Sequence, residues 1–157
     1  MMKGELALIS RVNSCGLLGI DGHVVVVETD TSNGLPLFDL VGLPDAAVKE
    51  AKERVRAALK NSGYEFPVKR ITINLAPANM KKEGAAFDLP IALGIMLATE
   101  QLAFPDVEEY AFIGELSLDG SIRPIAGVLP MVISLMAAGI KHVVVPVENA
   151  EEAAVVK

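Results

Sequence analysis

Alternating apolar and polar positions predict strands in the first third of the chain. Residues 6–13 are apolar with polar interruptions, and residues 17–20 and 23–29 flank the dipeptide Asp21-Gly22. Asp-Gly is a strong hairpin signal because both residues tolerate positive φ. A further strand is predicted over 35–41, after a turn-prone segment.

The spacing of apolar residues then becomes helical. A first helix is predicted to begin near Pro44 and Asp45, which suit a first turn, and to end at about residue 61 before Ser62-Gly63. A strand over 70–75 and a loop over 76–84 follow, and we expect that loop to be too polar to bury. A second helix, over 87–99, is apolar on nearly every side and is therefore expected to be central.

The last third mixes short strands and helices. Asp119-Gly120 predicts a second hairpin, between strands over 110–118 and 121–125. A helix over 128–138 is expected to end at Gly139, and it is followed by a strand over 142–145 and a helix that begins at residue 149. This order predicts one α+β domain with two layers, spanning 1–157. The last helix has no capping residue, so we expect the sequence to be cut from a longer protein.

Composition narrows the possible functions. The 157 residues are 52% apolar and 22% charged, which is enough for a buried core. The net charge of −6 excludes a uniformly basic nucleic-acid binder, and the 4% of aromatic residues argue against a single-strand reader that stacks bases. One cysteine, Cys15, excludes an internal disulfide, and we expect it to be buried. Without a targeting signal or an apolar span, the expected location is the cytoplasm.

Motifs of common catalytic and metal sites are missing. No G-x-x-x-x-G-K-[ST] is present, so the phosphate loop of an ATPase is not in this chain. The histidines, His23 and His142, lack metal-ligand spacing, and no metal site is expected. Asp88 lies near a predicted helix start and is interpreted as its N-cap.

Positive charge is concentrated between residues 49 and 82. This segment contains nine basic and three acidic residues, so its net charge is +6 and that of the rest of the chain is −12. One hypothesis is a solvated helix with internal ion pairs, and the other is a binding surface for a nucleic-acid backbone or an acidic subunit. The candidate binding residues are Lys49, Lys52, Arg54, Arg56, Lys60, Lys69, Arg70, Lys81 and Lys82.

Three stretches carry a resemblance to a known family. They are VGLPDAAVKE at 41–50, then NLAPA at 74–78 with KEG at 82–84 and FDLPIA at 87–92, and finally GEL at 114–116 with RPI at 123–125. Together they resemble the N-terminal domain of the YifB/ComM family of magnesium-chelatase-like AAA+ ATPases. The resemblance covers essentially the whole chain.

This resemblance implies a fold like the proteolytic domain of Lon, which is shared with the second domain of a small-subunit ribosomal protein. It also implies an AAA+ module beyond residue 157, absent from this chain, for which alone ATP and magnesium are expected. ComM-like members act as hexameric helicases in branch migration during natural transformation. The expected partners are therefore the chain's own AAA+ module, further copies in a hexamer, and DNA.

The Lon comparison also implies where a catalytic dyad would lie. Lon-like peptidases place a nucleophilic serine two residues after a glycine, and here Ala86 follows Gly84 in that position. The lysine base would follow a P-I-G-G-L-like turn, where this sequence has Leu129. Neither side chain can attack or accept a proton, so we expect a scaffold without catalytic residues.

Two other functions stay open at this point. One is a hydrolase with a displaced dyad, which would combine Ser117 or Ser121 with Lys81 or Lys82. The other is an accessory domain of a metal-chelatase complex.

Overall fold

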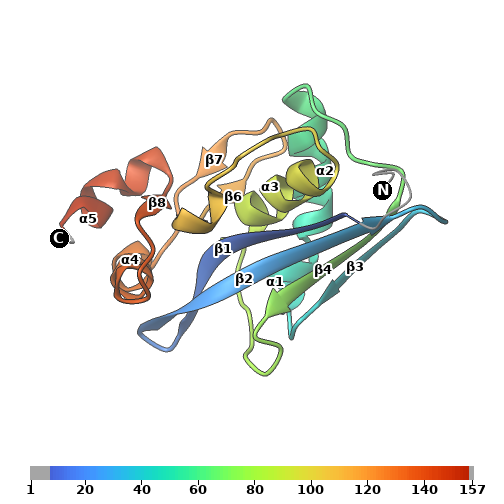
Figure 1. Ribbon diagram of the computed structural model, residues 1–157. Helices are drawn as coiled ribbons and strands as arrows, with labels where there is room; N and C mark the ends of the chain where they lie inside the picture. The colour runs from blue at the N-terminus through green and yellow to red at the C-terminus, as the bar shows by residue number, and fades with distance from the viewer. Residues whose placement is uncertain (1–7, 156–157) are drawn as a thin grey trace.

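The computed structural model describes residues 8–155 and shows a twisted sheet with helices packed on it (Figure 1). The strand order in the six-stranded sheet is β3-β4-β2-β1-β5-β8. β1 and β2 form an antiparallel hairpin, β4 is antiparallel to β2, and the pairs β3–β4, β1–β5 and β5–β8 are parallel. The strands are β1 Leu8–Leu18, β2 Asp21–Ser32, β3 Leu37–Val41, β4 Arg70–Ala76, β5 Tyr110–Phe112 and β8 His142–Val144.

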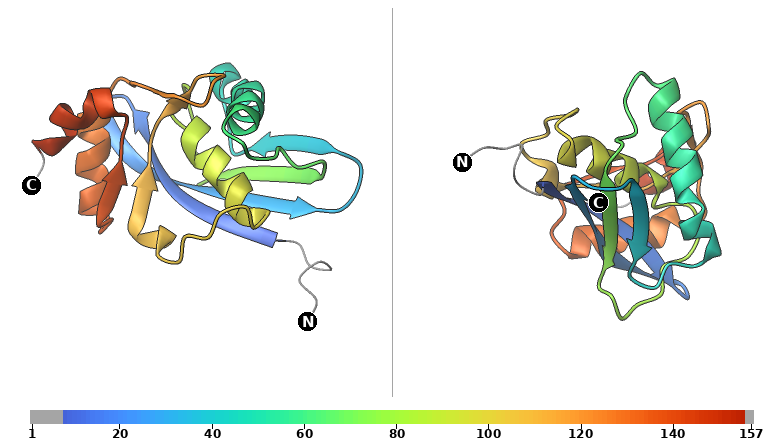
Figure 2. Two further views of the ribbon diagram at one scale, coloured as in Figure 1. Left: turned by 90° about the horizontal axis from the view of Figure 1, so that it is seen from above. Right: turned by 90° about the vertical axis from the view of Figure 1, so that its right-hand side faces the viewer.

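Helices and a small second sheet complete the domain, and the α+β prediction is confirmed. Figure 2 shows α3 lying across the sheet between α2 and the end that carries α4 and α5. The helices are α1 Ala46–Lys49, α2 Ala51–Asn61, α3 Asp88–Ala98, α4 Val128–Ala137 and α5 Ala150–Ala154, with 3-10 turns η2 Val107–Glu109 and η3 Val147–Asn149. The hairpin pairs β6 Glu115–Leu116 with β7 Ile122–Arg123. None of the helices within residues 8–155 has the length and apolar character that crossing a bilayer requires.

Two apolar clusters hold the layers together. In the larger, Val25 and Val27 of β2 pack with α2, β4 and the nearly all-apolar α3, which is central as predicted. In the smaller, Val24 and Cys15 pack with α4. Because neighbouring residues of a strand face opposite sides of the sheet, α4 covers the face that α3 leaves open. Cys15 is buried as predicted, and burial raises the pKa of its thiol to about 11.

Several predicted elements are confirmed with shifted bounds. The first helix is capped by Asp45, whose side chain accepts a hydrogen bond from the Val48 amide (2.8 Å), but a turn at Glu50 divides it into α1 and α2. The hairpin at Asp119-Gly120 and the helix end at Gly139 are also confirmed. The predicted strand over 110–118 is instead two short strands, β5 and β6. Residues 6 and 7 of the first predicted strand, and residue 156, lie outside the described residues.

The predicted position of the first turn, at Asp21-Gly22, was wrong, and the observed position gives Gly22 a different role. The turn lies at Gly19 and Ile20, with Leu18 paired to Asp21, so Gly22 is within β2. Gly19 supplies the positive φ of 65° that the turn needs. Gly22 is required for a different reason, since a Cβ there would lie 2.7 Å from the carbonyl oxygen of Pro130 in α4.

We predict that Gly22→Ala destabilises the domain by about 1–3 kcal/mol, because α4 would have to move away from β2. The free energy of unfolding in urea measures this effect. Ile20→Ala, in the exposed turn beside it, is the matched control and should change stability by less than about 0.5 kcal/mol. Equal stability of Gly22→Ala and wild type would contradict the close packing of α4 on β2.

Candidate functional site

Ala86 lies in a hollow where three parts of the chain meet. The hollow has a volume of about 500 Å³ and is open to solvent. Gly84, with φ of 82°, turns the loop before α3 so that residues 84–86 form one wall. Pro124, Ile125 and Met131 also line the hollow, and Ala86 and Ile125 both pack against the smaller cluster.

Leu129 lies outside the lining of this hollow. It is in the first turn of α4, is half-buried, and donates its amide hydrogen to Oε2 of Glu152 at 3.0 Å. Ala86 and Leu129 therefore do not close the cleft between them, and the hollow remains.

The ionisable side chains that line the hollow are all carboxylates. Among the described residues that line it, Asp45, Glu83 and Glu115 are the ionisable ones, and none carries a hydroxyl, thiol, amine or imidazole. The oxygens of Asp45 accept hydrogen bonds from the amides of Val48 and Gly84 (2.8 and 3.2 Å), so they hold the local backbone. Within residues 8–155, no group of three or more His, Cys, Asp or Glu side chains is arranged to hold a metal ion.

Ser117 and Ser121, the serines considered for a displaced dyad, are hydrogen-bonded to Arg123 and Asp119 rather than to a lysine. Oγ of Ser117 accepts a hydrogen bond from Nε of Arg123 at 2.6 Å, and Oγ of Ser121 donates to Oδ1 of Asp119 at 2.7 Å. Both bonds lie within the β6–β7 hairpin. Lys82 instead donates from Nζ to the carbonyl oxygen of Pro77 in its own loop.

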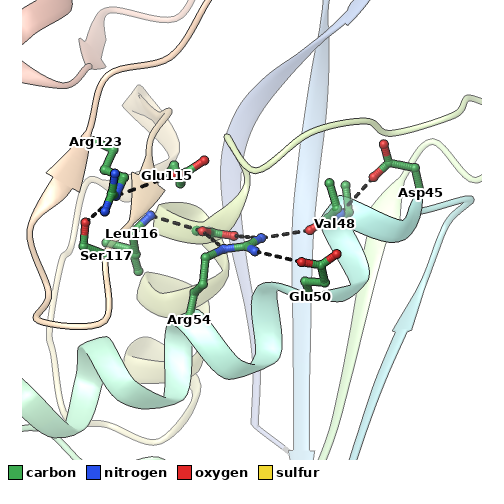
Figure 3. A network of polar contacts seen from close by, with 10 residues as sticks. Asp45, Val48, Glu50, Arg54, Glu115, Leu116, Ser117 and Arg123 are labelled. Carbon is green, nitrogen blue, oxygen red and sulfur yellow. Dashed lines mark hydrogen bonds and ion pairs between the residues drawn. The ribbon is translucent and has the colours of Figure 1, made fainter.

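Asp88 and Arg54 form the central ion pair of the domain (Figure 3). Nε and Nη2 of Arg54 donate to the two oxygens of Asp88 at 2.6 and 3.1 Å, and the Leu116 amide donates to the same carboxylate at 3.1 Å. Nη2 also donates to the carbonyl oxygen of Ala47 at 2.8 Å, and Glu50 lies 3.8 Å from Nη1. One guanidinium and one carboxylate thus join α1, α2, α3 and β6.

The interpretation of Asp88 as an N-cap was wrong. The cap residue of α3 is Phe87, and Asp88 is the first residue of the helix, fully buried. Burial raises the pKa of the Asp88 carboxyl, while the hydrogen bonds from Arg54 and Leu116 act in the opposite direction. The hydrogen bond to Asp88 raises the pKa of the Arg54 guanidinium. Arg54 is therefore engaged inside the domain and is withdrawn from the candidate binding residues.

Lys82 is also withdrawn from that set, because only 1% of it is exposed. Its backbone pairs with the segment before α1, through bonds from the Lys82 amide to the carbonyl of Leu43 (3.0 Å) and from the Asp45 amide to the carbonyl of Lys82 (2.9 Å). Burial lowers the pKa of the Lys82 ammonium group. The expectation that the whole loop over 76–84 stays exposed was therefore wrong at this residue.

The remaining basic residues divide between a groove and scattered positions. The groove has a volume of about 690 Å³ and runs between α2 and β3, at the edge of the sheet. With four cations and the single acid Glu65, it carries a net charge of +3. Lys49, Arg70 and Lys81 are exposed outside it. The cations of this basic groove are Lys52, Arg56, Lys60 and Lys69.

Aromatic and aliphatic side chains form the floor and rim of the basic groove. The rings of Phe38 and Phe66 have centroids 6.0 Å apart, and Arg56 lies over Phe66 with Cζ 4.9 Å from the ring centre. Leu37 and Val68 are 43% and 81% exposed on the rim. The low aromatic content of the chain gave no sign of this arrangement, because the aromatic residues come from segments on both sides of α2.

The family of the chain can be assigned from its similarity to known proteins. Residues 27–149 match the family described as subunit ChlI of Mg-chelatase. The chain belongs to this family. It is 45% identical over 144 residues to the uncharacterized protein YifB of Salmonella typhimurium, and 43% identical over 148 residues to the competence protein ComM of Haemophilus influenzae.

These matches cover 92% and 94% of the chain but only 28% and 29% of the two relatives. The chain therefore spans less than a third of their length. It is also 24% identical to the Lon protease of Trichlorobacter lovleyi, over 97% of this chain and 19% of that protein. The predicted family resemblance is confirmed, and so is the similarity to Lon.

We predict that Asp88→Asn destabilises the domain by about 3 kcal/mol or more, because Arg54 is left without its charged partner in a mostly buried position. Urea unfolding measures the change. The double variant Arg54→Met/Asp88→Asn should regain at least about 1 kcal/mol, since no guanidinium is then left unpaired while the amide oxygen still accepts from Leu116. Glu50→Gln, at the exposed partner of Arg54, is the control and should cost less than about 0.5 kcal/mol. Additive effects of the two substitutions would contradict a direct pair.

Proposed function

We propose that this chain is the non-catalytic N-terminal domain of a ComM-like AAA+ ATPase, in which it helps the motor subunits assemble into a ring. ATP and magnesium would be used by the ATPase module, and the protein would work in the cytoplasm. Two features support the proposal. The hollow around Ala86 lacks a nucleophile, and the basic groove exposes aliphatic side chains of the kind that protein contacts bury.

The observation that carries the non-catalytic assignment is the lining of the hollow. A nucleophile and its base act as a unit, so removing either one abolishes nearly all catalysis. Ala86 has only a methyl group at the position of the nucleophile, and the carboxylate of Asp45 is held by backbone amides. A cleft with this lining can accept a segment of chain, but it offers no group for acyl transfer.

We predict that the chain neither cleaves unfolded casein nor forms an adduct with a serine-reactive phosphonate, as read from its intact mass. A Lon protease treated in parallel is the positive control. A stoichiometric adduct on Ser117 or Ser121, or cleavage that persists through repurification, would instead show a displaced dyad and overturn the non-catalytic assignment.

DNA engagement is a second candidate function, and the four cations of the basic groove favour it. Phosphate contacts release counterions, so each contact steepens the dependence of affinity on salt. If the groove binds DNA, replacing Lys52, Arg56, Lys60 and Lys69 with glutamine should weaken DNA binding by the full-length protein. It should also reduce the salt slope by about one unit for each phosphate that is no longer neutralised. The control is Arg70→Gln/Lys81→Gln, which removes two exposed charges outside the groove; an equal loss per charge in both variants would exclude a groove-specific role.

A further inference from the structure

The two ends of the sheet carry opposite charge. The basic groove lies beside β3, the first strand in the sheet order, and η3 and α5 follow β8, the last strand. Figure 1 shows α5 at the far left of the molecule and α2 with β3 at the right. The surface of η3 and α5 is here called the acidic patch, and its exposed valines and glutamates are Val147, Glu148, Glu151, Glu152 and Val155.

Each surface combines exposed aliphatic residues with charges that have no counterion within residues 8–155. Val147 and Val155 are 81% and 67% exposed in the acidic patch, as Leu37 and Val68 are exposed on the rim of the groove. Among the ion pairs of the described part of the chain, none includes Lys60 or Lys69 of the groove, or Glu148 or Glu151 of the patch. Exposed apolar residues with a polar rim can mark a protein-binding surface, and complementary charge determines which partner it meets.

We propose that the acidic patch of one copy docks into the basic groove of the next. Valines would pack on the aliphatic rim, and Glu148 and Glu151 would face the cations of α2. Pairing groove with groove, or patch with patch, would bring like charges together and leave the other surface exposed. The contact is therefore head to tail, and copies joined in this way form a ring if the rotation between them closes.

This inference rests on the proposed assembly function and names the two surfaces through which copies would assemble. A DNA strand in the groove would explain its cations, but it would leave the aliphatic side chains of Leu37 and Val68 exposed to water and give the acidic patch no role. A second copy accounts for both surfaces at once.

Charge reversal with mixing tests the contact directly. One variant, Arg56→Glu/Lys60→Glu, makes the groove negative; another, Glu148→Lys/Glu151→Lys, makes the patch positive. Each variant alone then has two ends of the same sign, whereas in a 1:1 mixture every groove can again meet a patch of opposite charge.

Sedimentation velocity from about 10 μM to about 1 mM protein at low salt measures the association. Wild type should associate, and each variant alone should associate at least about tenfold more weakly. The mixture should recover association to within about threefold of wild type.

Controls separate this contact from general charge effects and from DNA binding. Asp106→Lys/Glu108→Lys and Arg70→Glu/Lys81→Glu change exposed charges elsewhere and should associate like wild type. A wild-type chain that stays monomeric throughout the concentration series, or a mixture that fails to recover, would overturn head-to-tail docking. Abolished DNA binding by the groove variant with unchanged association would overturn it too, and would assign the groove to DNA. Casein cleavage would overturn only the non-catalytic assignment. Failure of that assignment can therefore be distinguished from failure of head-to-tail docking.

Discussion

The buried pair of Arg54 and Asp88 is the interaction on which the arrangement of the domain depends. Its bidentate hydrogen bonds join α2 to α3, and the further bonds to Ala47 and Leu116 bring in α1 and the start of the β6–β7 hairpin. Removing a carboxylate from water is costly, and here the cost is offset by three donors that leave neither oxygen without a partner. A nonpolar pair could fill the same space, but it would make none of the directional hydrogen bonds that join these elements.

That orientation determines the shape of the hollow around Ala86. Asp88 follows closely after residues 84–86, so the helix start that the ion pair anchors also holds one wall of the hollow. Asp45 ties the same loop to α1 through the Gly84 amide, and Lys82 joins it by backbone pairing. The loop that carries Ala86 is therefore held at both ends by hydrogen bonds, while the side chains at Ala86 and Leu129 are apolar.

The sequence predicts those features that depend on local pattern. The helix start near Asp45, the apolar α3 and the hairpin at Asp119-Gly120 each follow from neighbouring residues, and the short motifs identified the family. It did not predict what depends on distant partners. Asp88 resembles an N-cap until Arg54, 34 residues away, is placed against it. Gly22 resembles a turn residue until α4 packs on it, and the burial of Lys82 depends on pairing with the strand-like segment at Pro44. In each case tertiary packing overrode a local preference.

The distinction between local sequence pattern and tertiary packing also applies to the basic residues. Sequence position alone gathered nine basic residues into one segment, but the fold gives them different roles. Arg54 and Lys82 serve the interior, and the four in the groove remain available to a partner. Because the sheet separates this groove from the acidic residues after β8, the cations cannot be neutralised by the chain's own acids at the other end. An acidic chain that keeps a basic groove at one end of its sheet presents two surfaces of opposite sign, and for that reason we propose a copy of the chain as the partner of each.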